Sequence, residues 1–259
     1  MSRSSSTSPT ARSAALVLSL LAAGACSQRA HATSACGNLA YQVSDPLEPA
    51  NRAVFAFNRT VDDYLLAPVA RGYGMLPGFA RQGVHNFANN FGEPKVFVND
   101  LLQGNGDRAM TSLARVIFNT TLGVAGVIDV AGKMGLSQHR SDFGQTFGVW
   151  GIANGPTVEL PLLGTHNLRD ATGSVLSLAV DPFGDNSDTV TLSTVATAGH
   201  VVDSRAAALP LTAWLQTWPD YYLALRDYTA QQRNNLVAEG KAGKPGTWQA
   251  NCSQVTGHE

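Results

Sequence analysis

Charged residues are scarce in this chain of 259 residues. Asp, Glu, Lys and Arg make up 14% of it, against roughly 25% in an average soluble domain. The 18 basic and 19 acidic residues nearly cancel, and no basic stripe gives an electrostatic reason to expect a nucleic acid as partner. Because charged side chains normally cover much of a soluble surface, we expect something other than water to contact part of this protein.

Catalytic and ligand-binding motifs are also missing. The chain contains no HExxH zinc motif, no GxSxG nucleophile elbow, no EF-hand loop, no P-loop and no dinucleotide fingerprint. Its six histidines lie at spacings without metal-ligand geometry. The sequence therefore predicts no enzyme activity, no cofactor and no metal. Arg169 is a candidate for contact with a phosphate head group, because a guanidinium is well shaped for phosphate; the competing interpretation is a local ion pair with Asp170.

Apolar runs long enough to span a bilayer, at least about 18 residues, do not occur in this sequence. The N-terminus instead carries Arg3 and Arg12, followed by an apolar stretch at residues 14–25 that ends in small residues. This order predicts a secretory signal peptide over residues 1–25.

Cys26 follows these small residues in a context that resembles a lipobox, where bacterial lipoproteins are cleaved and diacylated, although Ala23 stands where Leu is usual. Cleavage there removes 25 of the 259 residues and leaves 234. Ser27 resembles the signal for passage to the outer membrane. The alternative is cleavage after Ala32, where residues 30–32 have the A-x-A form and the product is a free soluble chain.

Cysteines are few, three in all. If Cys26 is lipidated, Cys36 and Cys252 remain, an even number in an oxidising compartment. A disulfide between them and a pair of free thiols are both open. A metal-binding or catalytic thiol is disfavoured, because no CxxC or Cys/His spacing is present.

The organised region is predicted at residues 45–240, between a polar tether at 26–44 and a loop-like tail at 241–259. It opens with Asp45, Pro46, Leu47 and Glu48, which has the form of a capping box. An apolar stripe then recurs at helical spacing, on Ala50, Ala53, Val54, Phe57, Val61, Tyr64 and Leu65. Phe55 falls on the otherwise polar opposite face, which predicts either a second packing contact or contact with lipid.

Further helices are predicted at residues 79–91, 96–102, 168–180 and 218–237. Another starts with Asp107 as its cap and turns an apolar face inward, on Ala109, Met110, Leu113, Val116 and Ile117. Two short apolar runs flank residues 153–156, which predicts a β-hairpin within residues 147–160. Its glycines, Gly151 and Gly155 among them, would leave it mobile.

Five blocks of sequence, in this order, resemble the MlaA (VacJ) lipoprotein family. They are residues 45–58 (DPLEPANRAVFAFN), 93–104 (EPKVFVNDLLQG), 114–132 (ARVIFNTTLGVAGVIDVAG), 143–164 (FGQTFGVWGIANGPTVELPLLG) and 168–173 (LRDATG). Residues 218–240 resemble the closing helix of the family, whereas residues 181–215 show little resemblance.

The resemblance implies a mainly α fold, in which one ring-like domain of amphipathic helices with one short β-hairpin lies in the inner leaflet of the outer membrane. It implies a lipid-anchored protein on the periplasmic side whose central channel admits phospholipids misplaced in the outer leaflet. Such proteins bind trimeric porins and pass the lipid to a periplasmic carrier of the MlaC type, which maintains lipid asymmetry. No enzyme chemistry is implied.

Carried over by position, the resemblance assigns two groups of residues. The first helix would contribute to the ring and channel through Asp45, Pro46, Leu47, Glu48, Asn51, Arg52, Phe55, Phe57 and Asn58. The predicted hairpin would be a gate through Gly151, Asn154 and Gly155. Ala50, Ala153 and Thr157 depart from the family pattern, which bears on the mobility of the gate. Maintenance of the fold is the alternative for every one of these positions, and is favoured for Asp45, Leu47 and Asn51.

Two other functions compete with lipid transport. A soluble periplasmic hydrolase or binding protein, released after Ala32, would have a compact core and a closed pocket with a nucleophile and a base. A passive structural partner of porins would share the location of a lipid transporter but would move no lipid.

Overall fold

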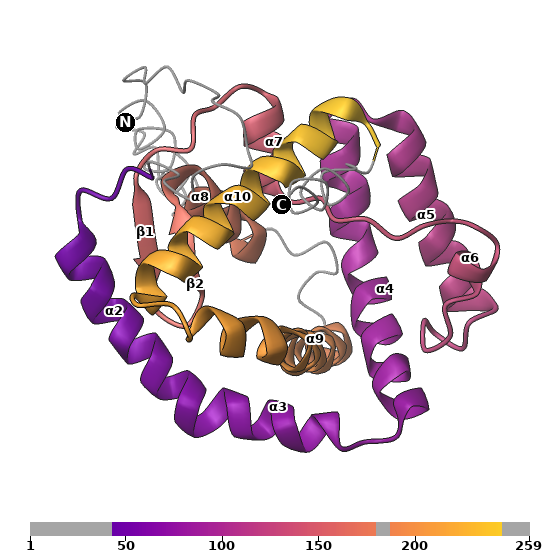
Figure 1. The fold of residues 1–259 in the computed structure, drawn as a ribbon. Helices are drawn as coiled ribbons and strands as arrows, with labels where there is room; N and C mark the ends of the chain where they lie inside the picture. The colour runs from indigo at the N-terminus through magenta and orange to yellow at the C-terminus, as the bar shows by residue number, and fades with distance from the viewer. Residues whose placement is uncertain (1–42, 180–186, 245–259) are drawn as a thin grey trace, which may run out of the picture.

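A computed structural model describes residues 43–179 and 187–244 (Figure 1). The predicted signal peptide, the predicted tether up to residue 42, most of the tail and the three cysteines, Cys26, Cys36 and Cys252, lie outside these residues. The described chain is mainly α, as predicted. Its first half contains α2 (Glu48–Val61), η1 (Asp62–Leu66, a π-helix), α3 (Ala67–Gly74), α4 (Gly78–Leu102), α5 (Gly106–Thr121) and α6 (Val130–Lys133). Its second half contains α7 (Phe143–Val149), β1 (Thr157–Leu160), β2 (Gly164–Asn167), α8 (Leu168–Ala179), α9 (Ser187–Leu215) and α10 (Tyr221–Ala242).

The helices are arranged as a ring rather than as a bundle (Figure 1). α2, α3 and α4 follow the perimeter one after another, α9 packs along α3 and α4, and α5 packs along the other side of α4. α7, α8 and the small sheet lie together, and α10 packs on α7 and β2. The predicted ring-like, mainly α architecture with one β-hairpin is confirmed.

The β-hairpin lies further along the chain than predicted. β1 and β2 are antiparallel, with Thr157 paired to Asn167 and Leu160 paired to Gly164, so residues 161–163 form the turn. Residues 147–149, the start of the predicted hairpin, belong to α7 instead. The Asp142 carboxylate caps this helix by accepting from the Gln145 N–H at 2.8 Å. The prediction of a turn at Gly151–Gly155 is therefore wrong.

Gly151 and Gly155 lie in the loop between α7 and β1. Their φ angles are +89° and +68°, in the region that glycine enters without steric cost. Their role in this structure is to reverse the chain between a helix and a strand.

α4 is one continuous helix, whereas the sequence predicts two. Pro94 lies inside it, and a proline removes one intrahelical hydrogen bond and normally kinks or ends a helix. Packing against α5 on one side and α9 on the other carries α4 across this position. This is a case in which tertiary contacts override local preference.

The predicted capping box at the first helix does not form. α2 begins at Glu48 with Leu47 as N-cap and no side-chain cap. The Asp45 carboxylate instead accepts hydrogen bonds from Asn51 Nδ2 at 2.8 Å and from the Tyr222 hydroxyl of α10. Glu48 pairs with Arg52 at 2.8 Å. Asp45 and Glu48 therefore make contacts with other side chains instead of capping α2, and the contacts of Asp45 include one with α10.

Candidate functional site

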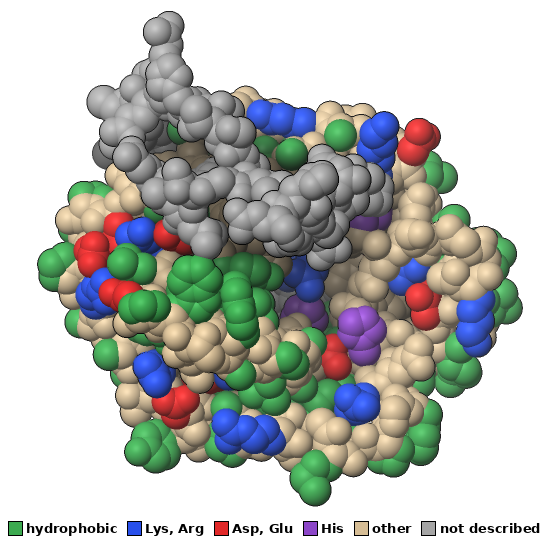
Figure 2. All heavy atoms as spheres, viewed as in Figure 1, with side chains coloured by type: hydrophobic (Ala, Val, Ile, Leu, Met, Phe, Trp, Pro, Cys, Tyr) green, Lys and Arg blue, Asp and Glu red, His purple; other side chains and the backbone are tan. Residues whose placement is uncertain are grey.

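The apolar stripe of α2 and η1 faces outward. Phe57 is 52% exposed, Tyr64 84% and Leu65 57%, although a stripe of this kind normally packs on a core. Exposed apolar side chains continue along α3 and into the start of α4, at Val69, Met75, Leu76 and Phe79. We call these residues, together with Phe57, Tyr64 and Leu65, the apolar belt. Figure 2 shows hydrophobic side chains scattered around the rim of the face in view.

The polar stripe of α2 faces inward, and Asn51 shows how it is satisfied. Asn51 is buried; its amide donates to the Thr157 carbonyl at 3.0 Å and accepts from the Glu159 N–H at 3.0 Å. Asn58, two turns later, donates to Glu159 Oε1 at 2.8 Å and accepts from the Leu162 N–H at 2.8 Å. These two asparagines therefore attach α2 to the β-hairpin by both of their amide atoms.

Phe55 belongs to this inner face rather than to the exposed apolar belt. It is half-buried, and its ring meets Tyr221 and Tyr222 edge-on at centroid distances of 5.4 and 5.3 Å. The sequence predicted that Phe55 makes either an additional packing contact or a contact with lipid, and the structure contains the packing contact.

Arg52 joins α2 to the start of α10. Its guanidinium pairs with the Asp220 carboxylate at 2.6 Å and lies over the Tyr222 ring at 4.6 Å. The hydrogen bond from Arg52 lowers the pKa of Asp220, as does the Leu223 N–H, to which Asp220 is the helix cap. Arg52 and Asp220 thus hold the two helices at one corner.

α5 has the same inverted arrangement as α2. Met110 is 61% exposed and Ile117 is also exposed, so the prediction that they face inward is wrong. The buried side of α5 consists of Ala109 and four polar residues at helical spacing, Arg108, Ser112, Arg115 and Asn119.

The inward face of α5 meets acidic groups of α4 and of the segment after α5. Arg115 donates to Glu93 Oε1 at 2.6 Å and lies 3.3 Å from Asp129. Burial raises the pKa of Glu93, against the opposing effect of Arg115. His139 and Ser112 both reach Asp100 Oδ2, His139 at 2.6 Å. Polar contacts thus occupy the place that a hydrophobic core takes in most domains.

The loop between α5 and α6 is apolar and satisfies its own backbone. Leu122, Val124, Val127 and Ile128 are exposed. The N–H groups of Leu122, Gly123, Ala125, Gly126, Val127 and Ile128 all donate to carbonyls within residues 118–124. A loop can lie against hydrocarbon only when its backbone groups are paired internally, and this loop meets that condition at these positions.

The predicted gate and head-group residues meet at the loop before β1. Arg169 Nη1 donates to Asn154 Oδ1 at 2.6 Å, and Asn154 donates to Asn234 of α10 at 3.0 Å. Arg169 is 5% exposed and pairs with Asp170 at 2.8 Å. The structure thus gives Arg169 the ion pair that was the competing interpretation, and a buried guanidinium cannot reach a head group without rearrangement.

Sequence reasoning missed the cluster that supports this loop. Arg233 of α10 pairs with Asp142 at 2.7 Å and with Asp170 at 2.8 Å. Although burial opposes it, the Arg233 hydrogen bonds lower the pKa of Asp142. These residues are 91 and 63 positions apart, and no local pattern signals such a contact. In α5, by contrast, the helical spacing of the polar residues was a signal.

Residues 43–179 and 187–244 contain neither a membrane-spanning helix nor a cluster of metal ligands. None of the helices there has the length and hydropathy needed to cross a membrane. Within the same residues, no group of three His, Cys, Asp or Glu residues is placed to hold a metal ion.

Comparisons with known proteins agree on one family. The model of the MlaA lipoprotein family matches residues 43–236. The intermembrane phospholipid transport system lipoprotein MlaA of Escherichia coli (strain K12) is 36% identical over 214 residues, 78% of this chain and 81% of that protein. An uncharacterized protein of Rickettsia felis is 38% identical over 201 residues, 76% of this chain and 79% of that protein.

A solved structure is similar in fold as well as in sequence. It was described as the structural basis for maintenance of bacterial outer membrane lipid asymmetry, and it superposes with a TM-score of 0.65 at 34% identity. The match covers 75% of this chain and 99% of that chain. With its ring of inverted amphipathic helices and these matches in sequence and structure, the chain belongs to the MlaA lipoprotein family.

Proposed function

We propose that this protein is an outer-membrane lipoprotein that removes misplaced phospholipids from the outer leaflet and passes them to a periplasmic carrier, which maintains lipid asymmetry. The ring would lie in the inner leaflet, and the lipid would pass through its centre. Membership of the MlaA family and the function of its relative from Escherichia coli, a lipoprotein of the intermembrane phospholipid transport system, support this role.

The observation that carries the proposal is the inversion of the amphipathic helices. α2 and α5 expose apolar residues of their stripes, whereas the buried side chains are Asn51 in α2 and, besides Ala109, the polar residues Arg108, Ser112, Arg115 and Asn119 in α5. In water an exposed apolar belt of this extent would be unfavourable and prone to association. Against acyl chains the same belt is stabilised.

The exposed apolar stripes also support the proposed location. Amphipathic helices that expose an apolar stripe would lie in one leaflet, with that stripe against acyl chains. Diacylation at Cys26 would anchor the ring to that leaflet, since each buried CH₂ contributes about 0.8 kcal/mol. A trimeric porin and a soluble carrier of the MlaC type are the proposed partners on the two sides of the transfer.

The residues predicted to form the channel and gate keep that role as part of the proposal. Asn51, Arg52 and Asn58 fix α2 to the sheet and to α10, so they would set the shape of the ring. Gly151, Asn154 and Gly155 lie in the loop before β1, where Asn154 bridges α8 and α10 through Arg169 and Asn234. This loop would move if those contacts opened.

The decisive experiment measures phospholipid in the outer leaflet of cells that lack the protein. We expect a rise that wild type reverses, and that Cys26→Ala reverses less well because the anchor is lost. Cys36→Ala is the matched control, because it removes a cysteine without removing the lipidation site. No rise on deletion would contradict the proposal and favour a passive partner of porins. Recovery of the wild-type protein in the soluble fraction would favour the soluble alternative.

A further inference from the structure

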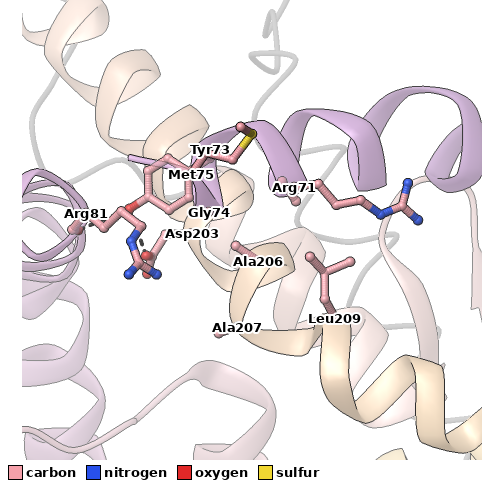
Figure 3. A pocket seen from close by; sticks show the side chains of 10 residues that line it. Arg71, Tyr73, Gly74, Met75, Arg81, Asp203, Ala206, Ala207 and Leu209 are labelled. Atoms are coloured by element: carbon pink, nitrogen blue, oxygen red, sulfur yellow. Dashed lines mark hydrogen bonds between the residues drawn. The ribbon is translucent and has the colours of Figure 1, made fainter. Parts of the chain in front are cut away.

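A hollow of about 460 Å³ opens at the corner where α3 turns into α4, against α9 (Figure 3). It combines charged groups with an apolar wall. Its lining residues from α9 are Asp203, Ala206, Ala207 and Leu209, and those from α3, the corner and α4 include Arg71, Tyr73, Met75 and Arg81.

The carboxylate of Asp203 is the fixed anionic group of the hollow. It accepts from the Tyr73 hydroxyl at 2.9 Å through Oδ1 and from His85 Nδ1 at 2.7 Å through Oδ2. Burial and the hydrogen bond to Asp203 raise the pKa of Tyr73 to about 12, so this hydroxyl stays a donor at physiological pH. Each carboxylate oxygen has two acceptor positions, which leaves one on each oxygen for a ligand.

The cationic group of the same hollow is Arg81. Its Nε donates to the Leu76 carbonyl at 3.2 Å, and its terminal nitrogens have no hydrogen-bond or ion-pair partner among residues 43–179 and 187–244. Figure 3 shows the Arg71 guanidinium directed away from that of Arg81 along α3. Arg81 and Asp203 therefore form the pair of opposite charges that a single ligand could address.

The rim of the hollow is part of the apolar belt. Met75 is 86% exposed and lines the hollow, and Phe79, 81% exposed, follows at the start of α4. Cationic side chains beside exposed apolar ones are typical of a surface at the boundary between acyl chains and head groups. A ligand in the hollow would thus have its charged part inside and its hydrocarbon beside Met75.

We propose that this hollow binds the head group of a zwitterionic glycerophospholipid that carries a primary ammonium, with its phosphate on Arg81 and its ammonium on Asp203. This proposal names a binding site for the lipid of the proposed transport function. It rests on that function in one respect, that the protein is in contact with phospholipid. An ammonium with three N–H donors can hydrogen-bond the free acceptor positions of Asp203, whereas a trimethylated ammonium has no N–H. The site therefore distinguishes ethanolamine from choline head groups.

The test compares dihexanoyl phosphatidylethanolamine with dihexanoyl phosphatidylcholine, binding to the full chain in detergent by calorimetry. A hydrogen bond to a charged group is worth enough for about tenfold in affinity, so we expect wild type to prefer the ethanolamine lipid by about that factor. Asp203→Asn should abolish the preference and retain binding of the choline lipid. Arg81→Gln should weaken the binding of both lipids, because both carry the phosphate.

Two controls keep the result specific. Lys133→Gln removes a cation from α6, away from the hollow, and should change neither affinity. Tyr73→Phe keeps the carboxylate while removing its hydroxyl partner, and should keep the preference. If Asp203→Asn does not fold, the wild-type preference and the Arg81→Gln result still decide.

Equal wild-type affinities for the two lipids, or the same loss in Lys133→Gln as in Arg81→Gln, would overturn the proposal. Either outcome would leave the outer-leaflet phospholipid experiment unaffected. The failure of this site is therefore distinguishable from a failure of the transport function.

Discussion

At the scale of single residues, polar side chains with several partners make the connections that apolar contacts make elsewhere. Asn51 links α2 to the hairpin through its donor and its acceptor, and Asp45 accepts from both Asn51 and Tyr222. Burying an amide is favourable only when its hydrogen bonds are made. Each such residue therefore specifies one arrangement of the elements that it joins.

The Arg52–Asp220 pair makes stability depend on pH in a defined direction. The pKa of Asp220 is lowered in the folded protein by its hydrogen bond with Arg52, whereas an unfolded Asp titrates near about 3.9. Its contribution is therefore present above that value and lost as the pH falls through the folded pKa. We expect Asp220→Asn to be less stable at neutral pH, and to lose less stability than wild type between about pH 5 and 3.

The measurement is thermal unfolding in detergent at a series of pH values. Comparing the two proteins removes the effect of other carboxylates, such as Asp142 and Asp129, whose pKa is also lowered. Parallel curves over the acid range would contradict the role given to Asp220.

Gly151 should tolerate alanine poorly for a backbone reason. A Cβ added there meets nothing within 4 Å, but its φ is +89°, a conformation that costs an L-residue about 1–2 kcal/mol. Gly92 inside α4 has equally open space and no positive φ, so alanine there should stabilise by about 0.5–1 kcal/mol. Thermal unfolding of Gly151→Ala and Gly92→Ala should shift in opposite directions; shifts of the same sign would show that the backbone argument fails.

At the scale of elements, α2 carries two phenylalanines with different surroundings. Phe57 is exposed on the apolar stripe, and Phe55 packs on Tyr221 and Tyr222 of α10. The two residues are two positions apart, which places them on different faces of the helix. The Phe55 ring is covered by protein, whereas the Phe57 ring is exposed.

Serine substitution should distinguish Phe57 from Phe55. Phe57→Ser is expected to weaken binding to phospholipid vesicles by about 1 kcal/mol, about fivefold, through lost apolar contact, and to leave thermal stability in detergent nearly unchanged. Phe55→Ser should lower stability by roughly 2 kcal/mol with little direct effect on vesicle binding. Vesicle flotation and thermal unfolding of both variants check this; equal effects on both measurements would remove the assignment of faces.

At the scale of the whole molecule, the interior is polar and the perimeter apolar. The largest fully buried side chains of the described residues are Gln145, Glu93, Asn99, Asn119, Thr146, Asp100, Asp170 and Ser112, whereas Tyr64, Met75 and Phe79 are more than four-fifths exposed. A soluble domain distributes these residue types in the opposite way.

The state of association should therefore depend on detergent. We expect a single protein per micelle in mild detergent and self-association when the detergent is removed, because the belt then meets water. Size-exclusion chromatography with light scattering measures both states. A stable monomer in detergent-free buffer would favour the soluble alternative and would contradict the membrane location.

The sequence predicted most of the helices and the hairpin, but it predicted the residues at which they begin and end less well. The helical periods of α2 and α5 were visible in the sequence, and a helix over residues 218–237 and a hairpin within residues 147–160 were predicted. The hairpin was placed too early because Gly151 and Gly155 resemble turn residues, while the cap that starts α7 at Asp142 went unnoticed. A glycine permits a reversal of the chain, but the reversal can be a hairpin turn or a loop between a helix and a strand.

The amino-acid sequence is enough to show that α2 and α5 are amphipathic, that charge is scarce, and that the chain resembles the MlaA family. It leaves open which face of α2 or α5 points inward, because hydrophobic periodicity distinguishes an apolar face from a polar one without saying which of them is buried. That orientation depends on tertiary contacts, which bring Glu93 to Arg115, Asp220 to Arg52 and the hairpin to Asn51. Polar groups can be buried once partners from distant segments satisfy them, and the apolar faces then remain for the membrane.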